Sequence, residues 1–308
     1  MPDADDTGQG RADPAVTATG VAGAAPIVDG PSRSTAAAGT VESPGATSAA
    51  ETLVLWPDTF TNHLSPHVGI AAVEVLEALG YDVVVPEGRV CCGLTWHSTG
   101  QLDVTKAVLR RTLRVLEPHL EAGHRVVGLE PSCTVMLTEA HELLPDDPRA
   151  HRLAELVVTL AQVVAPHAES DPAAAQAGKD ADAQVAHGTG RTSTWPFGTL
   201  DAAAVAQVHC HLKAKGSYEP DRVVLRRLGV DVDEVGGGCC GLAGNFGFEP
   251  GHYEVSTACG ERELFPKVNC CGGDDLVLAD GFSCRTQIEQ GTDRSGLHLA
   301  EVLRRALG

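Results

Sequence analysis

Two cysteine doublets occur in the same local setting, at residues 91–92 and at residues 239–240, and a glycine directly follows each of them. A single cysteine often packs as a small hydrophobic residue, but packing does not explain a repeated doublet. Glycine lets the backbone approach a bulky inorganic group and adopt a positive φ. The doublets therefore indicate that these thiols bind a metal ion or a cluster.

The second half of the chain offers four cysteines for one site, namely Cys210, Cys239, Cys240 and Cys284. They fall on three predicted loops. Cysteine thiolates are the usual ligands of iron–sulfur clusters, and four of them also suit tetrahedral zinc. A disulfide within the doublet is sterically awkward and is disfavoured in a reducing compartment. We expect these four residues to bind the cofactor, with a cluster and zinc both open.

The first half offers only three cysteines, Cys91, Cys92 and Cys133. The region that matches Cys210 reads Trp-Pro-Asp-Thr-Phe-Thr-Asn-His and contains no cysteine. One interpretation is that Asp58 or His63 supplies a fourth metal ligand. The other is that this half has lost its cofactor and kept only the fold.

The remaining cysteines have no counterpart in the other half. Cys259 lies in a predicted helix over residues 252–265 and is expected in the core. Cys270 and Cys271 form a further doublet that no matched position repeats. We interpret this doublet as incidental, with an extra metal or redox contact as the alternative.

Three charged or titratable residues flank Cys210. In an extended segment, alternation places His209 and His211 on the side opposite the cysteine. We therefore expect core histidines, or donors to the ligands, rather than ligands. Lys213 has two interpretations. Its positive charge offsets the negative charge of a thiolate-bound cluster, or its side chain is simply solvated.

Residues 236–241 read Gly-Gly-Gly-Cys-Cys-Gly and satisfy the dinucleotide-binding pattern G-x-G-x-x-G. Such a loop should open directly into a helix whose N-terminus meets the pyrophosphate. Residues 242–251 are instead predicted to form a loop, so we exclude nucleotide binding at this segment.

The elements that position the cysteines repeat along the chain. Val-Leu-x-x-Leu-Gly-x-Asp-Val precedes each of the two doublets, and Ser-Cys follows each of them. Matched positions lie 148, 149 or 151 residues apart. Three landmarks in one order at nearly one period indicate a duplication.

Each copy is predicted to alternate strands and helices. In the first copy the apolar runs predict strands at residues 52–56, 81–85 and 125–129, and helical spacing predicts helices at 68–79 and 104–116. This alternation favours an α/β fold with parallel sheets. The cysteines then fall at the carboxyl ends of the strands, where sites form in such folds.

Two stretches have the composition of unfolded chain. Residues 1–50 contain no Leu, Phe, Tyr or Trp and are predicted to be disordered. Residues 168–194 have the same character and are predicted to be a low-complexity linker. They leave two domains, at residues 51–167 and 195–308.

Charge and hydropathy exclude several functions. The 308 residues include 23 basic and 41 acidic ones, for a formal net charge of −18, which argues against nucleic acid as a partner. No apolar run approaches the ~20 residues of a membrane-spanning helix, and the N-terminus lacks the apolar stretch of a secretory signal. We expect a cytoplasmic protein, peripheral to a membrane only through partners.

Two copies of a Cys-Cys-Gly element, each followed by a further cysteine, resemble the cysteine-rich CCG domain. That domain occurs twice in the B subunit of heterodisulfide reductase, and in iron–sulfur subunits of glycolate oxidase and anaerobic glycerol-3-phosphate dehydrogenase and in lactate-utilisation proteins. Four segments are similar to the C-terminal part of fused FAD-linked dehydrogenases of the D-lactate and D-2-hydroxyglutarate type: 56–62, 209–211, 239–247 and 280–284.

The resemblance implies two CCG domains packed together around iron–sulfur chemistry. The complete CCG pattern ends in C-x-x-C, whereas Glu130 and Gly281 stand where its first cysteine is expected. The non-cubane cluster that five cysteines support therefore lacks a ligand here. A four-thiolate [4Fe-4S] cluster remains available to the second copy.

The leading hypothesis from the resemblance is an electron-transfer subunit, or C-terminal portion, of an FAD-linked D-2-hydroxyacid dehydrogenase for lactate, glycolate or 2-hydroxyglutarate. The chain carries no flavin domain, so FAD is expected on a partner subunit or domain, together with a ferredoxin-like iron–sulfur module. One alternative is a zinc-stabilised scaffold that docks a flavoprotein without redox chemistry. Another is a thiol–disulfide enzyme, weakened because no isolated C-x-x-C precedes a helix.

Overall fold

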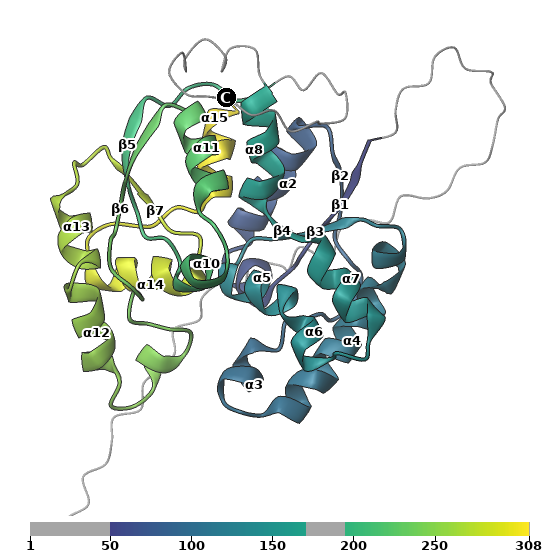
Figure 1. Cartoon of the computed structure of the whole chain (residues 1–308). Coiled ribbons are helices and arrows are strands. Elements are labelled where there is room, and N and C mark those ends of the chain that lie inside the picture. Colours follow the sequence, from purple (N-terminus) through teal and green to yellow (C-terminus); the bar gives the residue numbers. More distant parts are fainter. Residues whose placement is uncertain (1–49, 171–194, 308) are drawn as a thin grey trace, which may run out of the picture.

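The computed structural model describes residues 50–170 and 195–307, and in these ranges the strands form two parallel sheets (Figure 1). The first sheet contains β1 (Thr52–Leu55), β2 (Asp82–Val84), β3 (Arg125–Gly128) and β4 (Val157–Thr159), in the order β2-β1-β3-β4. The second contains β5 (Ala202–Ala206), β6 (Val230–Glu234) and β7 (Leu276–Leu278), in the order β6-β5-β7. The predicted α/β fold class is confirmed.

The two sheets share one strand order. In each, the first strand along the chain lies at the centre, with the second strand on one side and the third on the other. The fourth strand of the first sheet has a reduced counterpart, because Leu278 at the end of β7 forms an isolated parallel bridge with Leu297. This arrangement is compatible with the predicted duplication.

Helices follow the strands in both halves. Those of the first half are α1 (Thr59–His63), α2 (Pro66–Ala78), α3 (Leu94–Ser98), α4 (Leu102–Glu121), α5 (Pro131–Thr138), α6 (Ala140–Leu143), α7 (Pro148–Leu156) and α8 (Leu160–Ser170). Those of the second half are α10 (Cys210–Lys215), α11 (Glu219–Arg227), α12 (Tyr253–Glu261), α13 (Leu264–Cys270), α14 (Phe282–Gly291) and α15 (Leu299–Ala306), with a 3₁₀ turn η1 (Phe246–Phe248).

Local sequence explains where these helices begin and end. Pro66 occupies the first position of α2, and Gly80 ends that helix with a φ of 84°, as its position after the apolar run predicts. The single helix predicted over residues 252–265 is wrong. It is divided into α12 and α13, because a continuous helix would place the ring of Pro266 against the carbonyl of Arg262.

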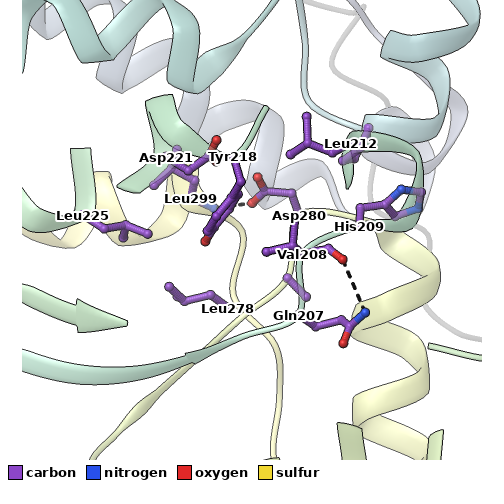
Figure 2. Close-up of a pocket in the computed structure, with 12 residues that line it drawn as sticks. Gln207, Val208, His209, Leu212, Tyr218, Asp221, Leu225, Leu278, Asp280 and Leu299 are labelled. Atoms are coloured by element: carbon purple, nitrogen blue, oxygen red, sulfur yellow. Dashed lines mark hydrogen bonds between the residues drawn. The ribbon is translucent and has the colours of Figure 1, made fainter. Parts of the chain in front are cut away.

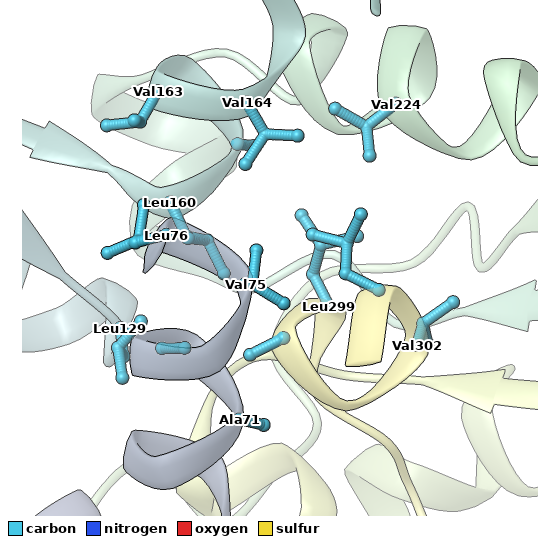
Figure 3. Close-up of a cluster of buried hydrophobic side chains, with 14 of the residues drawn as sticks. Ala71, Val75, Leu76, Leu129, Leu160, Val163, Val164, Val224, Leu299 and Val302 are labelled. Carbon is cyan, nitrogen blue, oxygen red and sulfur yellow. The ribbon is translucent and has the colours of Figure 1, made fainter. Parts of the chain in front are cut away.

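The halves pack against each other through a layer of four helices between the two sheets. Helix α8 packs on α11, and α15 packs on α2, so each half contributes one member of each pair. Figure 3 shows Val164 of α8 facing Val224 of α11, and Val75 of α2 close to Leu299 of α15. All four side chains are buried. This shared apolar core fixes the orientation of the two sheets.

Separate cores cover the outer faces of the sheets. One lies under α4 and α7 and includes Leu109, Leu113 and Leu153. The other lies under α13 and α14 and includes Phe265 and Ile288. Each sheet is thus covered by helices on both faces, as parallel sheets require.

The two segments predicted to be disordered or low-complexity lie almost wholly outside the described residues. Residue 50 and residues 168–170 are the exceptions. Residues 168–170 complete α8, and Ala168 is buried, so the predicted boundary at residue 167 falls inside a helix. In the part of the chain that is described, no helix is long and apolar enough to cross a membrane.

A buried carboxyl group lies at the junction between the halves. Asp221 of α11 is 3% exposed and, with Asp280 after β7, lines two cavities of about 10 and 20 Å³, each roughly the size of one water molecule. Figure 2 shows both carboxyl groups beside the ring of Tyr218. Burial first, and then the nearby carboxylate of Asp280, raise the pKa of Asp221 well above its ordinary value.

We predict that Asp221→Asn alters how stability depends on pH. The folded protein binds the Asp221 proton more tightly than the unfolded chain. This stabilisation is therefore complete below the ordinary pKa of 3.8 and is lost as pH rises toward the raised pKa. Each unit of the shift corresponds to about 1.4 kcal/mol. In thermal unfolding at matched cofactor content, the variant and the wild type should melt together near pH 4, and the variant should melt higher near pH 9.

Asp231→Asn, which removes an exposed carboxylate from neighbouring β6, is the matched control. Its melting temperature, plotted against pH, should run parallel to that of the wild type. If the melting temperature of Asp221→Asn also ran parallel to that of the wild type, the assignment of a bound proton to Asp221 would be contradicted.

Candidate functional site

The four cysteines of the second half follow the carboxyl ends of all three strands of the second sheet. The chain leaves β5 and reaches Cys210 at the first position of α10, and it leaves β6 for the loop that carries Cys239 and Cys240. It leaves β7 and reaches Cys284 in the first turn of α14. Because the strands are parallel and β5 lies between the other two, the three loops meet at one edge.

The thiols of this set contact one another in a row. Cys210 interacts with Cys239, Cys239 with Cys240, and Cys240 with Cys284. Hydrogen bonds that the Cys210 and Cys240 thiols donate to its sulfur lower the pKa of Cys239. Hydrogen bonding to Cys239 first, and burial as well, raise the pKa values of Cys210 and Cys240. The Cys239 thiol therefore ionises before those of Cys210 and Cys240. It is also the exposed member of the row.

Two polar side chains from the segment that follows β5 hold the loop that carries Cys239 and Cys240. The Lys213 ammonium donates to the carbonyl oxygens of Val235 and Gly237, at 2.9 Å each. The Gln207 amide donates to the carbonyl oxygen of Gly238 at 3.2 Å. This role of Lys213 has no signal in the sequence, because its carbonyl acceptors lie 22 and 24 residues away.

The glycine after each doublet has a structural reason. Gly93 has a φ of 83° and Gly241 a φ of 104°, a region that residues with side chains rarely adopt. A Cβ at Gly241 would also collide with the carbonyl oxygen of Ser256. The turn directs each glycine N–H at the first sulfur of its doublet, at 3.4 Å to Cys91 and 3.4 Å to Cys239. N–H groups aimed at sulfur stabilise the thiolate and tune a bound cluster.

The three cysteines of the first half also come together. The Cys92 and Cys133 sulfurs lie 3.1 Å apart, and Cys91 contacts Cys92. Hydrogen bonding to Cys92 and then burial raise the pKa of Cys91. For Cys133 the hydrogen bond from Cys92 lowers the pKa, but burial and the carboxylates of Asp58 and Glu130 outweigh it, and the pKa is raised. Both cysteine sets thus form at matched places in the fold.

Asp58, rather than His63, lies beside the first set. Asp58 is 1% exposed, whereas His63 is exposed on α1. One carboxylate oxygen accepts from the Thr61 N–H at 2.9 Å and caps α1, and the other is buried with no hydrogen-bond partner. Burial first, and then the charge of Glu130, raise the pKa of Asp58 to about 6. A buried carboxylate oxygen without a partner is the feature expected of a group that binds a ligand.

The segment around Cys210 is predicted from the sequence to be extended, but Cys210 and His211 begin helix α10 and His209 precedes it. His209 caps α10, its Nδ1 accepting from the His211 N–H at 3.2 Å. It occupies the same capping position that Asp58 occupies in the first half. Its ring is buried against Gly281, where any Cβ would collide with it. His209 is therefore a packing residue at the junction of the halves, as the core interpretation predicts.

The remaining cysteines divide into two groups. Cys259 is half-buried rather than in the core. It lines a cavity of about 160 Å³ that also borders Cys239 of the second set. Cys270 and Cys271 instead border a separate groove of about 320 Å³ over β5 and β6. The Cys271 thiol donates to the Val268 carbonyl at 2.9 Å and accepts from Arg294 at 3.3 Å.

The donor chemistry of the second set fits an iron–sulfur cluster. It brings four thiols from three loops to one edge of a sheet, with a glycine N–H directed at one sulfur, and cysteine is the usual ligand of such clusters. Across residues 50–170 and 195–307, no three His, Cys, Asp or Glu side chains are grouped so that they could hold a single metal ion.

The segment that holds the first set matches a family of known proteins. Residues 59–138 match the family called cysteine-rich domain, CCG, and this stretch runs from α1 to α5 and includes Cys91, Cys92 and Cys133. This stretch of the chain is similar to the CCG cysteine-rich domain. Asp58 lies one residue before the matched stretch.

Similar proteins match both halves of the chain. The chain is 27% identical over 252 residues to lactate utilization protein A of Bacillus velezensis, and the match covers 77% of this chain and 92% of that protein. It is 26% identical over 251 residues to the C subunit of anaerobic glycerol-3-phosphate dehydrogenase from Escherichia coli strain K12, and this match covers 80% of this chain and 57% of that protein. By their names, the first of these proteins takes part in lactate utilization and the second is a subunit of a dehydrogenase.

We predict that the two doublets of the second half of this protein differ in function. Cys239→Ser or Cys240→Ser should abolish cofactor binding there, because each removes a sulfur from the row that meets at the sheet edge. Cys270→Ser and Cys271→Ser should leave it unchanged, because those thiols border a different groove. Iron, sulfide and zinc per chain after anaerobic purification measure the difference. Equal loss in both pairs of variants would overturn the assignment.

Proposed function

We propose that this protein is an iron–sulfur electron-transfer subunit, or the C-terminal portion, of an FAD-linked D-2-hydroxyacid dehydrogenase. The observation that carries the proposal is the row of Cys210, Cys239, Cys240 and Cys284 at one sheet edge. Two relatives support an oxidoreductase role by their names. The Escherichia coli relative is a dehydrogenase subunit, and the Bacillus relative is a lactate utilization protein. The substrate would be lactate, glycolate or 2-hydroxyglutarate.

In this proposal, FAD is held by a partner subunit or domain, and a ferredoxin-like module completes the chain of carriers. A [4Fe-4S] cluster on the second set would supply one-electron transfer between the flavin and the acceptor. The residues of this chain supply four thiolates, the Gly241 N–H directed at Cys239, and the ties from Lys213 and Gln207 that hold the loop. Cys239 is the exposed member of the set and so faces the approach of a partner. A cytoplasmic location belongs to the same proposal.

Metal analysis of the anaerobically purified protein tests the proposal. A cluster predicts broad visible absorbance, with iron and acid-labile sulfide in near-equal amounts. A colourless protein with one zinc per chain would contradict it and would support the alternative, a zinc-stabilised scaffold that docks a flavoprotein. Four thiolates are also a zinc donor set, so the composition of the purified protein separates the two.

We predict that the two sets differ in how firmly they bind metal. Four thiolates complete the coordination of a [4Fe-4S] cluster, whereas three leave one iron to an oxygen ligand or solvent, which exchanges more easily. Metal in the first set should be lost earlier on mild chelation or exposure to air. Cys284→Ala should therefore reduce electron transfer more than Cys133→Ala, measured by dye reduction with the flavoprotein partner. The reverse order would place the functional site in the first half.

We also predict that Asp58 is the fourth ligand of the first set. Asp58→Asn keeps an oxygen that can cap α1 but removes the anionic donor, so metal in the first set should dissociate faster during chelation. His63→Ala, on the same helix, is the control and should retain metal like the wild type, because His63 is exposed. Faster loss in His63→Ala, or unchanged retention in Asp58→Asn, would contradict this ligand assignment.

A further inference from the structure

Glu130 has a carboxylate that caps two helices from different halves of the chain. It follows β3 and is 3% exposed. One oxygen accepts from the Ser132 hydroxyl at 2.7 Å and from the Ser132 N–H at 3.4 Å, in the first turn of α5. The other oxygen accepts from the Phe282 N–H at 2.7 Å, at the first residue of α14. The first half therefore supplies the N-terminal cap of a helix that belongs to the second.

Helix α14 has no cap of its own. Its N-cap residue is Gly281, which has no side chain to accept a hydrogen bond. A side chain at that position is excluded, because its Cβ would collide with the buried ring of His209. The first N–H groups of a helix have no acceptor within the helix, so the Phe282 N–H requires an acceptor from elsewhere. Glu130 provides it.

The capped turn carries a cysteine of the second set. Cys284 is the third residue of α14, as Cys133 is the third residue of α5. A second contact fixes the same turn to the first half, since the rings of Phe60 and Phe282 stack with centroids 4.8 Å apart and planes at 17°. The position of the buried Cys284 thiol thus depends on residues of the opposite half.

Glu130 also lies between the two cysteine sets. One of its oxygens is 4.0 Å from Nε2 of His209, the residue before Cys210. On the other side its charge acts on Asp58 and Cys133. Its carboxylate hydrogen-bonds to α5 and to α14, the helices that carry Cys133 and Cys284.

We propose that Glu130 is a positioning residue for the cofactor of the opposite half: it holds the first turn of α14 so that Cys284 meets Cys240, and it thereby couples the two cysteine sites into one unit. The cofactor part of this inference rests on the proposed function. The positioning part concerns only the chain itself and is tested without cofactor.

The first test measures how well Cys284 is held in the full-length, metal-free protein. Wild type and Glu130→Ala are alkylated anaerobically, and labelling of Cys284 is followed by mass spectrometry of its peptide. We expect labelling to be roughly fivefold faster in Glu130→Ala, the change that loss of one modest interaction produces. Glu130→Gln keeps one oxygen that can accept from the Phe282 N–H, so it should restore a rate close to that of the wild type.

Glu139→Ala is the matched control. Glu139 directly follows α5 and also reaches the second half, through an ion pair with Lys215 at 2.7 Å. This pair is partly exposed and does not involve α14. Its Cys284 labelling should equal that of the wild type. Equal labelling in Glu130→Ala and Glu139→Ala would overturn the proposal.

The second test uses the wild-type protein, so it holds even if Glu130→Ala does not fold. The amide of the first residue of a helix normally exchanges rapidly, because it has no acceptor in the helix. The Phe282 amide should instead be protected in hydrogen exchange, and fast exchange there would overturn the proposal. After reconstitution with iron and sulfide, Glu130→Ala should lose cofactor from the second set faster than Glu130→Gln. If the purified protein holds only zinc, the proposed function fails, whereas the labelling and exchange results still decide the role of Glu130.

Discussion

Parallel strand pairing is the constraint on which the rest of this structure depends. In each half, the strand that precedes the first site residue is hydrogen-bonded on both sides. Strand β1 lies between β2 and β3, and β5 lies between β6 and β7. Parallel pairing brings the carboxyl ends of all three strands to one edge. Residues as distant in sequence as Cys210 and Cys284 therefore meet, and the helices that follow the strands fix the direction in which each thiol enters the site.

The apolar layer between the sheets adds the second constraint. Helices α2 and α8 of the first half pack against α15 and α11 of the second. Their Val and Leu side chains are buried together, and this packing holds the two halves in one orientation. Hydrophobic burial is non-directional, so polar contacts at the ends of this layer define the remaining detail. Glu130 and His298 provide such contacts between the halves, through the Phe282 N–H and the Leu129 carbonyl respectively.

The two cysteine sites share a backbone and differ in chemistry. Both doublets end in a glycine of positive φ whose N–H is directed at sulfur. Where the second half has a cysteine at the start of α10, the first has Thr59, and its buried Asp58 occupies the capping position of His209 instead. One fold thus presents four thiols on one side of the junction and three thiols with a carboxylate on the other.

The sequence by itself determined the α/β class, the repeated order of elements and the cysteines that come together. These follow from local information: apolar periodicity, the glycine after each helix or doublet, and the recurrence of landmarks at one period. It also selected Asp58 as a ligand candidate but left His63 equal to it, because residue type and spacing do not report burial.

Only the tertiary structure shows that Asp58 is buried beside the first cysteine set while His63 is exposed, and only it reveals the contacts of Lys213 and Glu130. Lys213 meets carbonyl groups more than 20 residues away, and Glu130 meets an N–H group 152 residues away. Such contacts connect side chains to backbone groups that every residue possesses, so they leave no pattern in the sequence. They arise from the packing of whole elements, which brings distant backbone groups within hydrogen-bonding distance of a side chain.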